Sequence, residues 1–193
     1  MIDTMQIALI VAGLHLLILT IWVVATYNRF IRLKRHLDES WADIDVELKR
    51  RYDLIPNLVE AVKGYASYEQ ETLEKVVELR NRAMASKGDA SSQAVDESAL
   101  MIGMKKLFAL VEAYPDLKAD EHFLALQKEL ANTEDRIAAA RRFFNGNVRD
   151  LNILRESFPT NIIGNLFRFD EGSFFELESA AEGVVPKVNE EHA

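Results

Sequence analysis

The sequence has 193 residues, of which 49% are hydrophobic and 28% are charged, as is typical of one folded domain with appendages. Its 8 Gly and 4 Pro are too few for the many turns of a sandwich or barrel, and the absence of Cys excludes disulfides and thiolate sites. The formal net charge of −8 disfavours binding to nucleic acid, which needs a net basic face.

An apolar stretch opens the chain. Met5 to Thr26 carries no formal charge over 22 residues, and as a helix it would extend about 33 Å, enough to cross a hydrocarbon core of about 30 Å. Trp22 and Tyr27 near its end suit the headgroup layer. A cleaved signal peptide is the alternative, but no Lys or Arg precedes the stretch and the apolar run is too long for one. Residues 1–26 are therefore predicted to be a retained transmembrane anchor.

Four basic residues lie directly beyond this stretch, and we call them the membrane flank: Arg29, Arg32, Lys34 and Arg35. Before the stretch only Asp3 is charged. The positive-inside rule then predicts an outside amino terminus and places residues 27–193 in the cytoplasm. Because an anionic leaflet attracts cations close to its surface, membrane lipid is the first predicted partner.

Residues 27–169 are predicted to form four helices, because apolar residues recur at helical spacing in four stripes. These stripes run through residues 30–48, 55–79, 100–111 and 123–151. We expect a bend near residues 50–54, with Asp53 capping the second helix and Pro56 in its first turn. A kinked continuous helix is the alternative.

The connections between the later helices also have sequence signals. Ser86–Gln93 is predicted to be a flexible loop, and Ala113–Asp116 is predicted to be a turn because the residue before proline avoids helical geometry. Asp120 or a neighbour is expected to begin the last helix. The predicted fold class is therefore all-α, with an amino-terminal transmembrane helix followed by an antiparallel up-and-down four-helix bundle.

In that topology the fourth helix ends close to the membrane, where an apolar segment, residues 158–169, follows it. Its four candidate interface residues are Ile162, Ile163, Leu166 and Phe167. They either rest in the membrane interface or plug the open end of the bundle. We favour the plug, because every bundle needs its ends closed.

Lys49, Arg50 and Arg51 form a basic cluster near the predicted end of the first helix. Cations at a helix carboxyl end are stabilised by about 0.3–1 kcal/mol, and we favour this explanation. Docking of an acidic partner is the alternative, which makes the cluster a second candidate interface.

Motifs that carry chemistry are missing from the sequence. None of the four His is paired with another at i, i+4 around a Glu, and the chain has no Gly-rich phosphate loop and no Gly-x-Ser-x-Gly elbow. Paired carboxylates such as Asp43 and Asp45 lie about 200° apart on a helix and do not converge. We predict that the protein is not an enzyme and holds no cofactor or metal.

One long run of the sequence resembles the LemA family. The most specific part is Arg-Arg-Tyr-Asp-Leu-Ile-Pro-Asn-Leu-Val, residues 50–59, and the segments 40–46, 71–74 and 158–163 are similar to the same family. The resemblance implies a bacterial single-pass membrane protein with an outside amino terminus and a cytoplasmic four-helix bundle. It implies no reaction, and it suggests an HtpX-type quality-control protease as one partner.

The sequence thus predicts a non-enzymatic scaffold or interaction protein of the bacterial cytoplasmic (inner) membrane, which forms homo-oligomers or assists another membrane protein. The alternative is a membrane-surface module that senses or shapes lipid through the membrane flank and residues 158–169. The chain is expected to divide into an anchor (1–26), a bundle (27–169) and an acidic tail (170–193). The tail contains seven acidic residues and one Lys.

Overall fold

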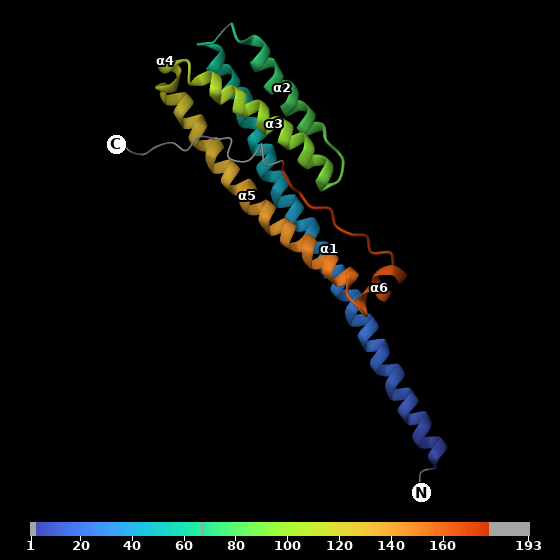
Figure 1. The fold of residues 1–193 in the computed structure, drawn as a ribbon. Coiled ribbons are helices and arrows are strands. Elements are labelled where there is room, and N and C mark those ends of the chain that lie inside the picture. Colours follow the sequence, from blue (N-terminus) through green and yellow to red (C-terminus); the bar gives the residue numbers. More distant parts are fainter. Residues whose placement is uncertain (1–2, 67, 178–193) are drawn as a thin grey trace. The chain divides into compact units, whose positions relative to one another are not determined.

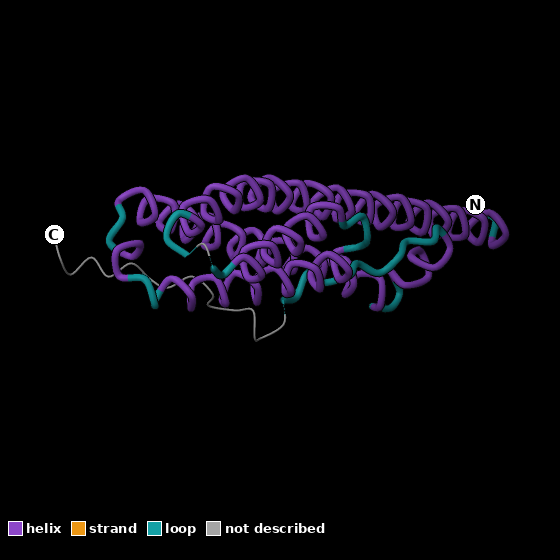
Figure 2. Tube along the Cα trace, turned by 90° about the horizontal axis from the view of Figure 1, so that it is seen from above, coloured by secondary structure: helices purple, strands orange, loops and turns teal. Residues whose placement is uncertain are grey.

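The computed structural model describes residues 3–66 and 68–177, which contain helices and no strand. The helices are α1 (Thr4–Lys63), α2 (Gln70–Ala85), α3 (Ala90–Val111), α4 (Pro115–Lys118), α5 (Glu121–Glu156) and α6 (Thr160–Leu166) (Figure 1). Figure 2 shows loops and turns between the helices of this part of the chain. The predicted all-α class is confirmed, and most of the predicted acidic tail lies outside the described residues.

The described residues divide into two compact units. The first contains the chain up to Glu39 together with Gly146–Gly172, and the second contains Ser40–Asn145 and the residues from Ser173 onward. Helices α1 and α5 contribute residues to both. The division into anchor, bundle and tail, like the up-and-down arrangement of the bundle, stays a prediction.

Helix α1 is 60 residues long and continues through Pro56. The predicted bend at residues 50–54 and the helix start at Asp53 are therefore wrong, and a continuous helix forms instead. Proline has no N–H to donate to the carbonyl four residues earlier, here that of Tyr52. Arg80 of α2 replaces the missing donor, because its Nε–H lies 2.9 Å from the Tyr52 carbonyl oxygen.

Replacing Arg80 with Met is expected to lower the free energy of unfolding by about 1–3 kcal/mol, because it leaves the Tyr52 carbonyl without a donor. In a Pro56→Ala background the helix supplies its own N–H to that carbonyl, so the same substitution is expected to cost much less. Urea unfolding of the four proteins in this cycle measures the difference. Equal costs in both backgrounds would contradict the replacement of the lost bond by Arg80.

The turn after α1 comes a dozen residues later than predicted. The second apolar stripe is divided between two helices, since Leu58 and Val62 belong to α1 whereas Leu73 and Val76 belong to α2. All four side chains are buried, so the stripe marks core residues correctly while the turn interrupts it. Helix α1 ends at Lys63, where the Val62 carbonyl accepts from the two N–H groups after Gly64, at 3.0 and 2.9 Å.

The starts of α3 and α5 both depend on aspartate. Asp89 caps α3 by accepting the Ser92 N–H at 2.9 Å, so residues 90–93 are helical and the predicted loop is shorter than expected. Asp120 accepts the Phe123 N–H at 2.9 Å at the start of α5, as predicted. The predicted turn at Ala113–Asp116 begins in the connection after α3, but its last two residues, Pro115 and Asp116, begin the short helix α4.

Helices α2 and α3 approach closely at Gly103. A Cβ atom there would lie 2.7 Å from Leu79 Cδ1, a separation that real Cβ atoms do not tolerate. Around this contact the second unit has an apolar core that draws residues from α1, α2, α3 and α5. Its buried side chains include Ile44, Leu48, Ile55, Leu58, Val76, Leu100, Met104, Leu107, Phe123, Leu130 and Ile137.

Candidate functional site

The second unit contains a buried charge network. Arg51 of α1 is 1% exposed, and its Nη1 lies 3.1 Å from both carboxylate oxygens of Glu134 on α5. Its Nη2 donates to the carboxylate of Glu97 on α3, which is fully buried. The network therefore joins three helices through one guanidinium.

Glu97 has two further donors. The hydroxyl of Tyr52, the residue that follows Arg51, donates to one Glu97 oxygen. Gln93, one turn earlier on α3, donates its amide to Glu97 Oε1 at 2.9 Å and to the Ala83 carbonyl at 3.0 Å. A buried carboxylate with three donors has the pairing that burial of a charge requires.

Charge and burial act in opposite directions on Arg51. Burial by itself lowers the pKa of the guanidinium, but the carboxylates of Glu134 and Glu97 outweigh it and raise the pKa above its ordinary value. For Tyr52, burial and the negative charge of Glu97 both raise the pKa of the hydroxyl above its usual value. In the network, the Arg51 cation and the neutral Tyr52 hydroxyl therefore both contact a carboxylate.

Above about pH 10, where a free tyrosine ionises, the stability of the protein is expected to fall with a contribution of about 1.4 kcal/mol per pH unit from Tyr52. A folded-state pKa above the unfolded one contributes stability that is full below the unfolded pKa and is lost as the pH rises. Tyr52→Phe removes this slope, at a cost of about 1–3 kcal/mol at neutral pH. Urea unfolding at several alkaline pH values measures both effects.

Tyr68→Phe is the matched control, because Tyr68 is 97% exposed and has no buried carboxylate to face. It should leave the alkaline slope unchanged. A slope that Tyr52→Phe does not alter would contradict the position of its hydroxyl against Glu97.

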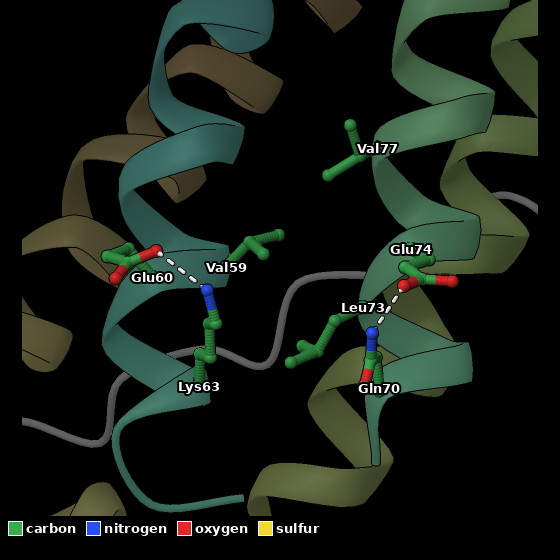
Figure 3. Close-up of a pocket in the computed structure, with 7 residues that line it drawn as sticks. All are labelled: Val59, Glu60, Lys63, Gln70, Leu73, Glu74 and Val77. Atoms are coloured by element: carbon green, nitrogen blue, oxygen red, sulfur yellow. Dashed lines mark hydrogen bonds and ion pairs between the residues drawn. The ribbon is translucent and has the colours of Figure 1, made fainter. Parts of the chain in front are cut away.

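A groove lies between the carboxyl-terminal part of α1 and α2, with a volume of about 380 Å³. Figure 3 shows Val59, Leu73 and Val77 pointing into the space between the two helices. Its polar lining is paired along each helix, since Lys63 Nζ lies 3.9 Å from Glu60 Oε2 and Gln70 donates to Glu74 at 2.7 Å. We call this the α1/α2 groove; it is an apolar strip with a polar rim.

The basic cluster does not form one surface. Lys49 is exposed and pairs with Asp45 at 2.6 Å, and Arg50 is exposed and pairs with Glu129. Arg51 is buried, so its candidate role in docking a partner is corrected, and it does not stand at a helix end because α1 continues to Lys63. The interface role of Lys49 and Arg50 stays a prediction.

The membrane flank is exposed at all four positions: Arg29, Arg32, Lys34 and Arg35. The four apolar candidates of residues 158–169 divide, since Ile163 is buried whereas Ile162, Leu166 and Phe167 are exposed. Within the described residues no group of three or more His, Cys, Asp or Glu side chains is placed to hold a metal ion.

The sequence did not predict Glu97, Glu134 and Tyr52 as partners of Arg51. One signal was present, because Arg51 lies three residues after Leu48 and four before Ile55, on the apolar stripe of its helix. Glu97 similarly precedes Leu100 and Met101 by three and four residues. A charged residue on an apolar stripe is predicted to be buried together with an oppositely charged partner, although the stripe does not identify that partner.

These features define an all-α protein in which a charge network joins the packed helices and one helix is apolar enough to cross a membrane. By length and composition, α1 alone among the described residues meets that condition, with a mean hydropathy of 2.7 over an 18-residue window that is not buried. The LemA family model matches residues 40–189. The chain belongs to the LemA family.

Individual relatives are more distant. The magnetosome protein MamQ of Magnetospirillum gryphiswaldense is 21% identical over 213 residues, which cover 96% of this chain and 78% of that protein. Protein LemA of Metamycoplasma hominis is 28% identical over 136 residues, or 70% of this chain and 62% of that protein. Magnetosome protein MamQ 2 of Paramagnetospirillum magneticum is 22% identical over 192 residues, or 86% and 71%. None of these names states a reaction.

Proposed function

We propose that the chain is a membrane-anchored, non-enzymatic helical interaction protein that assembles with itself or with another membrane protein. One observation supports this most strongly. Helix α1 runs unbroken from an 18-residue apolar window that is not buried into a part that packs against other helices. An uncovered apolar helix of this length suits a hydrocarbon environment, whereas its continuation is built as a folded protein.

The α1/α2 groove is the surface we propose for the partner. Val77 in the groove is exposed, and Val59 is partly so, which leaves an apolar strip open to a neighbour. The apolar side chains of a partner helix would fill such a strip, and the polar residues at its rim would set the direction of that helix. A second copy of this chain and a quality-control protease of the HtpX type are both candidates for that partner.

We further propose the bacterial cytoplasmic membrane as the location, with the amino terminus outside and the packed helices in the cytoplasm. The membrane flank supports this orientation, since its four cations follow the apolar part of α1 and are exposed. The relatives named as magnetosome proteins support a role at a membrane without identifying which one.

Photo-crosslinking in native membranes tests the proposal. A photoreactive benzoylphenylalanine at Val77 should give a discrete adduct, whose partner is then identified by mass spectrometry. The same residue at Val95, another exposed valine on α3, is the control and should give no such band. An adduct that contains only copies of this chain would show self-assembly, and one that contains another membrane protein would show an accessory role. Only uncrosslinked monomer at both positions would contradict the interaction role of the groove.

A further inference from the structure

Helix α6 is apolar on two sides. Ile163 and Gly164 are buried, and a Cβ on Gly164 would lie 3.3 Å from the Phe30 ring. On the other side Phe158, Ile162 and Leu166 are exposed by 81%, 53% and 69%. Ile162 and Leu166 are spaced four apart and share one face of α6, and Phe158 lies in the turn that precedes the helix. A plug needs only the buried side, so the exposed side is unexplained by packing.

Aromatic contacts hold the segment just after α6 beside the end of the apolar part of α1. The rings of Tyr27 and Phe167 are 4.9 Å apart at an edge-to-face angle of 63°. Phe30 stacks on Phe169, with ring centroids 4.5 Å apart. Trp22 packs against the apolar cluster formed by Phe30, Leu151, Leu154 and Ile163. All of these residues belong to one unit, so their mutual placement is fixed.

The depth of these contacts relative to the bilayer indicates what covers the exposed face of α6. Trp22 lies within the uncharged stretch and Tyr27 directly follows it, where a crossing helix enters the headgroup layer. A side chain packed against Tyr27 is then at the same depth. Exposed apolar side chains suit that layer, because the acyl boundary receives apolar groups.

We propose that Phe158 and the exposed face of α6 insert into the headgroup layer of the bilayer that α1 crosses. This inference rests on the proposed anchor and adds a second contact between the chain and lipid. The carboxylate of Glu171, which lies in the same unit, does not oppose it, because Arg155 pairs with Glu171 at 2.8 Å. The buried face of α6 closes the apolar cluster while the other face rests in lipid.

Single cysteines allow a direct test, because the chain contains none. The full chain is placed at one copy per nanodisc of phosphatidylcholine and phosphatidylglycerol, with the environment-sensitive fluorophore NBD at Ile162→Cys or Leu166→Cys. We expect blue-shifted emission, loss of intensity when the lipids carry bromine near the headgroup, and protection from aqueous iodide. Asp38→Cys, an exposed position eleven residues beyond Tyr27 on α1, is the control and should show water-like emission and full iodide quenching.

Leu14→Cys separates the two proposals. Quenching at Leu14 by deep bromines, together with iodide quenching at Leu166 equal to that at Asp38, would overturn the insertion of α6 and leave the anchor intact. Failure of quenching at Leu14 itself would overturn the anchor. Protection of Leu166 from iodide without quenching by bromolipid would show a cover other than lipid, and would also overturn the insertion.

Discussion

Replacing Arg51 with Met is expected to lower the free energy of unfolding by about 3–5 kcal/mol, because it leaves the carboxylate of Glu97 buried without its cation. Met keeps most of the side-chain volume, so the loss reports charge rather than packing. Urea unfolding of the full chain in a mild detergent, followed by circular dichroism, measures it. The expected result is a transition at much lower urea with the slope preserved.

The neighbouring residue supplies the control. Arg50 carries the same side chain on the same helix and pairs with Glu129, but its side chain is 43% exposed. Arg50→Met is therefore expected to cost about 0–1 kcal/mol, as exposed ion pairs do. Replacing Arg51, Glu97 and Glu134 together by apolar residues should recover much of the loss. Equal costs at positions 50 and 51 would contradict the buried network.

Two arginines placed one turn apart in the apolar part of α1, at Leu14 and Ile18, are expected to release the protein from membranes. Each arginine costs about 2.5–3.5 kcal/mol at the centre of a crossing helix, and the side chains at both positions are more than half exposed, so the arginines would face the hydrocarbon. Extraction of membranes at alkaline pH, followed by detection in the pellet and supernatant, measures the release.

Arginines at Val46 and Val95 are the matched control, since both are exposed valines in the second unit. That variant should stay in the membrane pellet as the unchanged protein does. If the Leu14→Arg, Ile18→Arg variant also stayed in the pellet, α1 would not be the element that anchors the chain.

Helical periodicity predicted which residues are buried better than it predicted where helices end. The stripe from Ile55 to Leu79 marks core residues of both α1 and α2, yet the sequence predicts a bend before Pro56, whereas the turn lies after Lys63. A proline is normally a sign of a helix start or break. Here Arg80, which lies 24 residues further along the chain, donates to the carbonyl that Pro56 leaves without its helical donor, and no local pattern contains that information.

The site was predictable only in part, for a similar reason. The basic cluster was visible in the sequence, but a run of three cations does not show which one points inward. The position of Arg51 between Leu48 and Ile55 indicates burial, whereas its pairing with Glu97 and Glu134 follows from the packing of three helices. Likewise, only the packing of Ile163 in one cluster with Phe30 shows that one face of α6 is buried while the other is exposed.

The network has a consequence for copies of the chain that meet in a membrane. Adjacent helical proteins can exchange equivalent helices, which yields intertwined assemblies. Moving α1 by one turn, about 5.4 Å, would carry Arg51 away from Glu97 and leave both charges buried alone. An exchange that keeps the original alignment would preserve every bond of the network. If copies of the chain traded α1, the network would therefore favour an in-register exchange over one that is shifted by a turn.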